Sequence, residues 1–391
     1  MLSRRVQSLQ ESAIRKLDGV VAQRSASGLH FHRVNIGQPD VPTPPELLDA
    51  AGSFRPEVLA YGPASGTADT RAATAAYHHR WCDRLTAADV AITTGGSEAL
   101  LFAFTAACDP GDEILAPEPY YTNYNGFATV AGVRVRPIPT RLDDGFAIPP
   151  DAELDELVTD RTRAFVFSNP SNPTGAVYGR ETVERLANWA QRHGIWLISD
   201  EVYRQIWFDA PPFSVLELEH DNLVVVHSLS KAWSACGARL GCLISRNAAL
   251  MEKVDRLGQA RLGPQPLAQA IARAAFALPE SYYEDLRATY KARINALLEG
   301  LARIEGVSTH RPAGAFYLMC RLPVTDTEAF GRYLATDFEH EGESVVVAPG
   351  PGFYSHPSKG RDEIRLAAVL GVPELTRSAE LLGLALEQYS G

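Results

Sequence analysis

The sequence predicts an α/β fold, with a large domain built on a mainly parallel, doubly wound sheet and a smaller α+β domain formed by both termini. Three observations predict this class. The chain has 391 residues, of which 46% are hydrophobic and 21% are charged, the ordinary balance of a globular protein with more than one domain. Short apolar runs alternate with helical patterns through the middle of the chain. The last third of the chain does not continue this alternation.

Five apolar runs of four to six residues predict buried parallel strands, because they are rich in β-branched residues and are followed by turn residues. They span residues 90–94, 113–117, 164–168, 195–199 and 223–227. Helical patterns at 98–108 and 181–193 separate some of these runs. Strands that alternate with helices in this way are typical of a doubly wound sheet.

The chain divides into three predicted parts. Residues 1–45 form an N-terminal segment with a Pro-rich connector, and we expect this segment to pack with the small domain. Residues 46–285 form the large domain, and residues 286–391 form the small one. A long amphipathic pattern at 281–304 leads into the small domain, which ends in a further helical pattern from residue 372 onward.

Charge and hydropathy exclude several classes of protein. The chain has 37 basic and 47 acidic residues, a net charge of −10, and it has no long basic run, which argues against a nucleic-acid partner. Its longest apolar stretch, at 99–108, is too short to span a bilayer. Residues 1–11 lack the apolar centre of a signal peptide. We therefore expect a cytoplasmic protein with no membrane partner.

The cysteine pattern predicts neither disulfides nor a metal site. The five cysteines form no CxxC pair and their number is odd, so a disulfide framework or a structural zinc site is not expected. They are Cys82, Cys108, Cys236, Cys242 and Cys320.

Ligands of open α/β sheets bind beyond the carboxyl ends of the strands, so the residues that follow each run are informative. Residues 95–98 (GGSE) follow the first run and lead directly into a helix, whose free N–H groups can bind an anion. An ordinary strand-to-helix turn explains them equally well. Tyr120, Tyr121 and Tyr124 follow the second run, where they either cover a flat ring or fill the core.

The other three runs also end in polar loops. The loop NPSNPTG at 169–175 is rigid and can fix an amide beside a ligand oxygen. Asp200 ends a buried run and needs a partner, for which we favour a protonated ring nitrogen. Lys231 follows the last run after Ser228, Leu229 and Ser230, with Arg239 eight residues further on. A lysine in a water-poor pocket near such a cationic group becomes a nucleophile.

One cofactor explains all five loops together. Pyridoxal phosphate requires a lysine that forms a Schiff base, an aspartate for its pyridinium nitrogen, donors for its phosphate and an aromatic side chain over its ring. Each of the five loops supplies one of these groups or a hydrogen-bonding amide.

The segment SLSK…GARLG at 228–241 and the loop at 169–175 resemble those of the fold-type I pyridoxal-phosphate aminotransferases, class I/II, of the aspartate aminotransferase superfamily. The resemblance extends from NIGQPD at 35–40 to EIRL at 363–366. It implies that an amino group moves between an L-amino acid and a 2-oxo acid, with pyridoxal 5'-phosphate as the cofactor. It also implies a homodimer whose active sites are shared between subunits.

The resemblance assigns a role to each catalytic residue. Lys231 matches the lysine that forms the Schiff base and acts as general base, and Asp200 matches the partner of the ring nitrogen. Tyr203 and Asn172 match the side chains that hydrogen-bond the 3′-oxygen of the ring. Tyr121 lies where the family stacks an aromatic side chain on the ring.

The resemblance also assigns the phosphate and substrate contacts. Those expected to bind the phosphate are Gly96, Ser97, Ser228, Ser230 and Arg239. Tyr61 resembles the tyrosine that reaches the phosphate of the partner subunit. Arg365 matches the arginine that binds the α-carboxylate of the substrate, with Gly37 and Asn172 beside it.

One departure from the family concerns substrate choice. Ser97 stands where related aspartate aminotransferases often carry a lysine that reads a side-chain carboxylate, which argues against strict aspartate specificity. Arg261 either replaces that lysine across a dimer interface or forms an ordinary salt bridge.

The sequence does not name the amino donor. A β-lyase, a decarboxylase or another enzyme that uses the same cofactor stays an alternative, as does a non-catalytic binding or regulatory protein on this fold.

Overall fold

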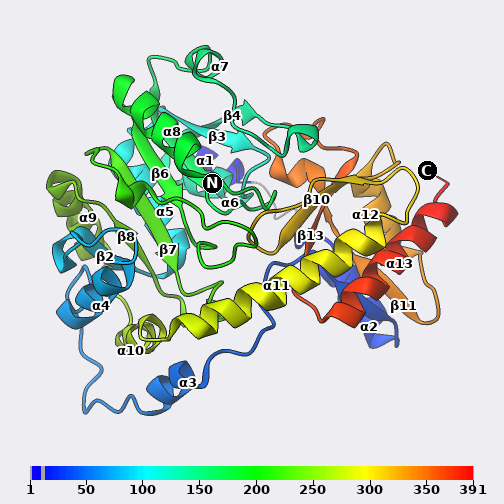
Figure 1. Cartoon of the computed structure of the whole chain (residues 1–391), viewed down its shortest axis with the longest axis horizontal. Coiled ribbons are helices and arrows are strands. Elements are labelled where there is room, and N and C mark those ends of the chain that lie inside the picture. Colours follow the sequence, from blue (N-terminus) through cyan, green and yellow to red (C-terminus); the bar gives the residue numbers. More distant parts are fainter. Residues whose placement is uncertain (1, 10–13, 391) are drawn as a thin grey trace.

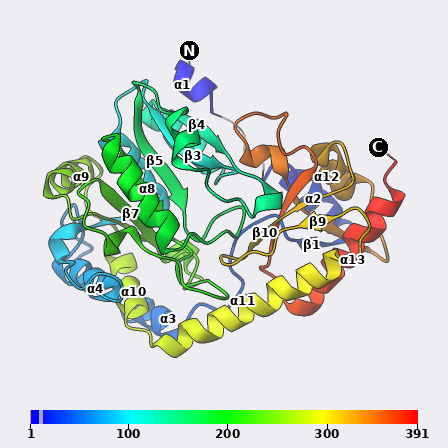
Figure 2. The ribbon, with the colours of Figure 1, turned by 45° about the horizontal axis from the view of Figure 1, so that its top comes forward.

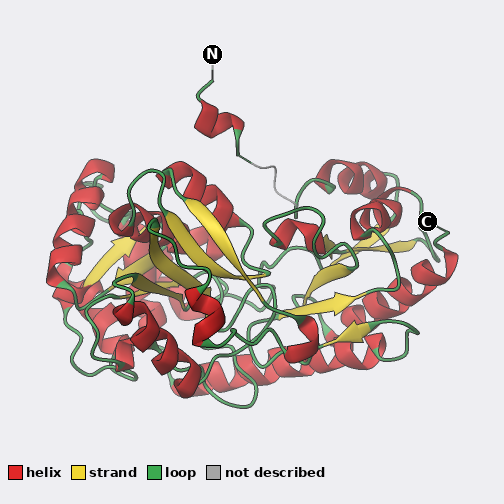
Figure 3. Cartoon of the chain, turned by 90° about the horizontal axis from the view of Figure 1, so that it is seen from above, coloured by secondary structure: helices red, strands yellow, loops and turns green. Residues whose placement is uncertain are grey.

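The computed structural model describes residues 2–9 and 14–390. Figure 1 shows two parts, each with its own strands, joined by the long helix α11 (Glu280–Leu301). Figure 3 shows the same division from above, with one group of strands on each side of the molecule. The pocket described below takes residues from both parts.

The larger part is built on a seven-stranded sheet in the order β2-β8-β7-β6-β5-β3-β4. Neighbouring strands are parallel except β8, which is antiparallel to both β2 and β7. The strands are β2 (Val90–Thr93), β3 (Glu113–Glu118), β4 (Arg134–Pro139), β5 (Thr162–Ser168), β6 (Trp196–Asp200), β7 (Leu223–Ser228) and β8 (Gly241–Ile244). The predicted α/β class with a mainly parallel sheet is confirmed.

Side chains along the strands alternate between the two faces of this sheet. Phe165 and Phe167 belong to the core on the face that α8 (Arg180–Arg192) covers, whereas Val166 and Ile198 belong to the core on the face that α5 (Gly95–Ala107) covers. Figure 2 shows α8 lying across the strands. Both faces are therefore buried, which explains why the strands read as continuous apolar runs.

The remaining α-helices are distributed over both parts of the molecule. They are α1 (Arg4–Gln7), α2 (Asp18–Ala26), α3 (Pro45–Gly52), α4 (Ala68–His78), α6 (Asn123–Ala131), α7 (Asp151–Asp155), α9 (Ala248–Arg261), α10 (Pro266–Phe276), α12 (Thr327–Thr336) and α13 (Val372–Gln388). Among the described residues, no helix combines the length and the apolar character needed to cross a bilayer.

The smaller part contains an antiparallel sheet in the order β12-β13-β10-β9 and a parallel pair of strands, β1 with β11. Its strands are β1 (His30–Arg33), β9 (Ser308–Thr309), β10 (Tyr317–Arg321), β11 (Glu343–Val346), β12 (Ala348–Pro349) and β13 (Glu363–Ala367). Val21 and Phe31 of the N-terminal segment pack with Ala335 and Val346. The domain boundaries at 45/46 and 285/286 stay a prediction, and the second lies inside α11.

Candidate active site

A pocket of about 290 Å³ opens where β6 and β7 end and where the two parts of the molecule meet. It brings together twelve of the predicted site residues, which are Gly37, Gly96, Ser97, Tyr121, Asn172, Asp200, Tyr203, Ser228, Ser230, Lys231, Arg239 and Arg365. Parallel strands that end at one edge explain why residues from distant loops converge here.

Lys231 follows β7 and points toward the smaller part of the molecule. Its Nζ donates a hydrogen bond to the carbonyl oxygen of Gly37 at 2.8 Å. The ring centres of Tyr203 and Phe316 lie 5.7 and 5.8 Å from this nitrogen. Within the described part of the chain, Nζ thus has one hydrogen-bond partner and two aromatic neighbours, surroundings in which an amine can act as a nucleophile and a base.

Asp200 is the last residue of β6 and is almost completely buried. Its Oδ2 accepts a hydrogen bond from the hydroxyl of Tyr124 at 3.1 Å, and its Oδ1 faces the backbone N–H of Val202 at 3.4 Å. Burial raises the pKa of Asp200 to about 6, although the bond from Tyr124 and the charge of Lys231 oppose this shift. A buried carboxylate of this kind favours a cationic partner in the pocket.

The N-terminus of α5 forms a cradle for an anion. Gly95 starts this helix with φ +77°, and a Cβ placed there would lie 2.7 Å from Nη2 of Arg239. A Cβ on Gly241 would lie 2.6 Å from the carbonyl carbon of Gly95 and 2.7 Å from the nitrogen of Gly96, so only glycine fits beside this turn. The free N–H groups, the helix dipole and the guanidinium together favour a phosphate.

Arg365 lies on β13 and is the only predicted side chain in the pocket that comes from the antiparallel sheet. Its Nη1 donates to Oδ1 of Asn172 at 3.0 Å, and its Nη2 donates to the carbonyl oxygen of Asn35 at 2.6 Å. The guanidinium carbon lies 4.4 Å from the ring centre of Tyr317 and 4.8 Å from that of Phe353. These contacts fix the plane of a buried cation that can bind a carboxylate through two hydrogen bonds.

Tyr317 is a pocket residue that the sequence did not predict. Its hydroxyl lies 2.9 Å from that of Tyr203. A Cβ on Gly37 would lie 1.7 Å from the Tyr317 oxygen, so this position admits only glycine. The sequence placed Tyr317 in an apolar stretch, and only the register of β10 with β13 shows that it faces the site. Tyr124 was noted as a core or ring-covering residue, but its bond to Asp200 was not foreseen.

Two predicted residues do not line the pocket of this chain. Tyr61 is 86% exposed. Arg261 ends α9, where its Nη1 lies 2.5 Å from Oε2 of Glu98 and its Nη2 donates to the carbonyl oxygen of Ala64 at 2.9 Å. The salt bridge that the sequence left open for Arg261 is therefore present within the chain, and its role toward substrate stays a prediction.

Comparison with known proteins decides the family. The profile described as aminotransferase class I and II matches residues 32–369. The chain belongs to this aminotransferase family. An aspartate/prephenate aminotransferase of Thermus thermophilus is 31% identical over 90% of this chain and 91% of its own. An arginine–pyruvate transaminase of Pseudomonas aeruginosa is 31% identical over 94% of this chain and 93% of its own. Among solved structures, an alanine aminotransferase from Pyrococcus furiosus aligns with a TM-score of 0.90, 28% identity and full coverage of both chains.

The aminotransferase is thus an enzyme that moves amino groups between amino acids and 2-oxo acids, and its family uses pyridoxal phosphate. The pocket fits this cofactor in its donor set. It offers an amine on Lys231, a buried carboxylate on Asp200, and a helix N-terminus with Arg239 for the phosphate. The ring of Tyr121 also lines the same space.

Proposed function

We propose that this pocket binds pyridoxal phosphate and an L-amino acid together, with Lys231, Asp200 and Tyr203 as the catalytic residues. The observation that carries the proposal is that Lys231, Asp200 and Arg365 all line one pocket, although Asp200 ends a strand of the large sheet, Lys231 lies in the loop after β7, and Arg365 belongs to the small antiparallel sheet. An amine, a carboxylate and a guanidinium at those places match the three charged groups of the reaction.

Different residues of the pocket would bind different groups of the cofactor. Asp200 would hold the ring nitrogen in its protonated form, Tyr121 would cover the ring, and Asn172 and Tyr203 would hydrogen-bond the 3′-oxygen. The phosphate would be held at the start of α5 by Gly96, Ser97, Ser228, Ser230 and Arg239. When bound, pyridoxal phosphate supplies an aldehyde that takes up the amino group and a ring that accepts electrons from the substrate Cα.

The chain itself then orients the substrate and moves its proton. Arg365 binds the α-carboxylate through its planar fork, and its bonds to Asn35 and Asn172 keep that fork in place. Gly37 fixes Nζ of Lys231 on the same side of the pocket. Lys231 would take the proton from the substrate Cα and return it to the cofactor carbon that receives the amino group, and the positioned groups would lower the barrier by orientation.

The amino donor does not depend strictly on an acidic side chain in this proposal. Similar proteins are named for aspartate, prephenate, arginine and alanine, so membership of the family leaves the side chain open. In this chain Ser97 offers no positive charge, and the guanidinium of Arg261 is already paired with Glu98. These two positions therefore offer no free positive charge that would favour an acidic donor over one with an uncharged or small side chain.

A panel of amino donors, each tested with 2-oxoglutarate and with pyruvate, tests the function. We expect more than one equivalent of the matching 2-oxo acid per subunit only when an acceptor is present, and no turnover in Lys231→Ala. Release of ammonia without an acceptor would instead indicate a lyase. Arg261→Ala is the matched variant for side-chain specificity, and a selective loss with acidic donors would show that Arg261 reads their carboxylate.

We further propose that the enzyme is a homodimer with shared active sites. Tyr61 lies in an exposed stretch with Val58 and Leu59, both 75% exposed. Leu262 is also exposed, and the adjacent Gly263 lies against the backbone of Gly62. Several large apolar side chains on one surface favour an interface, which would bring Tyr61 toward the pocket of the partner.

Light scattering of the wild type and of the double variant Val58→Asp, Leu59→Asp tests the dimer. We expect a wild-type mass near twice 42.5 kDa and a smaller, inactive variant. A fully active monomer would refute the shared site.

The five cysteines are free, which supports the expectation of a reducing, cytoplasmic location.

A further inference from the structure

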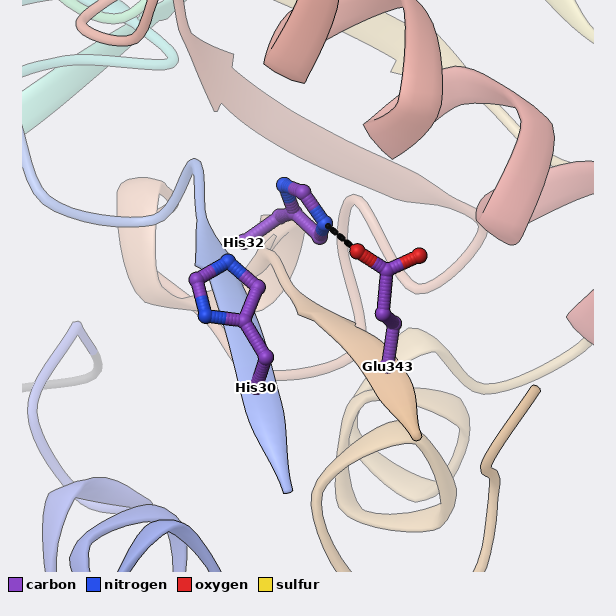
Figure 4. A group of neighbouring side chains, drawn as sticks. All are labelled: His30, His32 and Glu343. Atoms are coloured by element: carbon purple, nitrogen blue, oxygen red, sulfur yellow. Dashed lines mark hydrogen bonds and ion pairs between the residues drawn. The ribbon is translucent and has the colours of Figure 1, made fainter. Parts of the chain in front are cut away.

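A second group of metal-ligating side chains lies outside the cofactor pocket, on the parallel strands β1 and β11. His30 and His32 are alternate residues of β1, so their side chains leave the same face of the strand. Glu343 is the first residue of β11 and is the register partner of His30. Figure 4 shows the two imidazole rings and the carboxylate gathered beside one another.

The distances among these side chains suit a small divalent ion. Nε2 of His32 lies 3.0 Å from Oε1 of Glu343, and one ligand atom from each of the three residues lies within 4.8 Å of the other two. Zinc bonds to nitrogen and oxygen measure about 2.0–2.1 Å, so two ligands on a tetrahedral ion are roughly 3.3 Å apart. His30 is exposed and can rotate to close the remaining gap, while His32 and Glu343 already have this spacing.

The surroundings of the group are acidic and orient the carboxylate. Nε of Arg377 donates to the second oxygen of Glu343 at 2.6 Å, which leaves Oε1 toward the histidines. The same guanidinium also pairs with Glu341 and Glu380. Three carboxylates therefore surround one positive charge, so the local field attracts a cation. A bond from a neighbouring side chain to a ligating carboxylate is also typical of metal sites.

We propose that His30, His32 and Glu343 form a binding site for Zn²⁺ or a similar borderline divalent ion, with solvent as the fourth ligand. Two imidazoles and one carboxylate form a donor set that suits Zn²⁺, Co²⁺ and Ni²⁺ better than Mg²⁺ or Ca²⁺. The cysteine spacing considered in the sequence gave no sign of this site. The signal that identifies it is the His-x-His pattern on a strand together with a glutamate on the neighbouring strand.

An ion at this site joins two segments that are far apart in sequence. β1 and β11 form a sheet of only two strands, and the ion adds a link between His30 and Glu343. β1 also ends shortly before Asn35 and Gly37, whose carbonyl oxygens hold Arg365 and Lys231. The expected effect is a more stable attachment of the N-terminal segment, with no part in the transfer of amino groups.

A titration with ZnCl₂ tests the site. It uses the full-length protein, loaded with cofactor and then freed of excess cofactor. We expect one ion per chain by calorimetry and a higher melting temperature with the ion. His30→Gln is the decisive variant, since His30 is exposed and its loss leaves the fold intact; it should weaken binding at least tenfold. His356→Gln removes an exposed histidine elsewhere and should leave binding unchanged.

Two further results separate this site from a simple ion pair. Co²⁺ should give the intense visible bands of a four-coordinate ion in the wild type, and these bands should be lost in His30→Gln. Glu343→Gln should weaken binding as well. If zinc does not bind, or binds His30→Gln as tightly as the wild type, the proposal is wrong and His32 with Glu343 is only a hydrogen-bonded pair. Transaminase activity of His30→Gln should match the wild type in either case, so the test is independent of the proposed function.

Discussion

The buried carboxyl group of Asp200 should make the stability of the cofactor-free enzyme depend on pH. Burial raises the pKa of Asp200 from its ordinary 3.8 to about 6, so folding favours the protonated form. The stability that this group contributes is therefore fully present below pH 3.8 and is lost as the pH rises through 6. The difference corresponds to about 3 kcal/mol in total, since a pKa difference of one unit is worth about 1.36 kcal/mol.

Urea unfolding of the cofactor-free wild type and of Asp200→Asn measures this effect. The amide does not ionise, so the difference in unfolding free energy between the two proteins isolates the carboxyl group. We expect the wild type to lose about 2 kcal/mol relative to the variant between pH 4.5 and pH 7.5, because part of the total change falls below that interval. A difference that stays constant over this range would refute the assignment of a raised pKa to Asp200.

Added pyridoxal phosphate provides a control on the same group. A protonated ring nitrogen facing the carboxylate should stabilise its charged form, so the pH dependence of the difference should largely disappear with bound cofactor. Tyr124→Phe should act in the opposite direction. Its hydroxyl donates to Oδ2 of Asp200, and loss of this bond should raise the pKa of Asp200 further. The pH dependence measured without cofactor should then move to higher pH.

Three other substitutions test the site and its support. Arg365→Lys keeps the charge but loses the planar fork, so kcat/KM should fall about thirtyfold for every donor, a loss of about 2 kcal/mol. Glu201→Gln breaks the fully buried pair with Arg204, in which Oε2 lies 2.9 Å from Nη1, and should lower the unfolding free energy by about 3–5 kcal/mol in urea. Gly241→Ala places a Cβ against the backbone of Gly95, so it should displace the start of α5 and weaken cofactor binding about tenfold by fluorescence titration.

Each of these substitutions has a contradicting outcome. A strong preference of Arg365→Lys between acidic and apolar donors would show that Arg365 reads the side chain. Glu184→Gln removes an exposed pair on α8 and should cost less than about 0.5 kcal/mol, and an equal cost in Glu201→Gln would show that burial does not matter there. Gly126→Ala meets open space and should leave cofactor binding unchanged, and unchanged binding in Gly241→Ala would refute the cradle at α5.

The sequence predicted the parts of the fold that are buried on both faces. The five apolar runs correspond to β2, β3, β5, β6 and β7. It missed β4, because charged residues and prolines interrupt its pattern at the edge of the sheet, and β8, which has only four residues and begins with a glycine. Sheet order and the antiparallel direction of β8 depend on contacts between distant segments, which no local pattern carries.

The candidate site was predictable wherever a residue stands at a strand end or in a family motif. Lys231 and Asp200 were predicted in this way, and the structure places both of them in one pocket, while their roles stay a prediction. Tyr317 was not found, because its stretch reads as core and only the pairing of β10 turns it toward Gly37. The pairing of Arg261 with Glu98 was also hidden, since it depends on how α9 packs beside α5.

The position of Arg365 sets a limit on how the chain can be shortened or recombined. One of its hydrogen bonds goes to the backbone of Asn35 and the other goes to Asn172, while the arginine itself lies near the C-terminus. A fragment that begins after residue 35 would keep Lys231, Asp200 and Arg365 but would lose one of the two bonds that orient the guanidinium. Exchange of N-terminal segments between relatives would therefore change the orientation of the Arg365 guanidinium wherever it shifts the backbone carbonyl of residue 35, even with Lys231, Asp200 and Arg365 left in place.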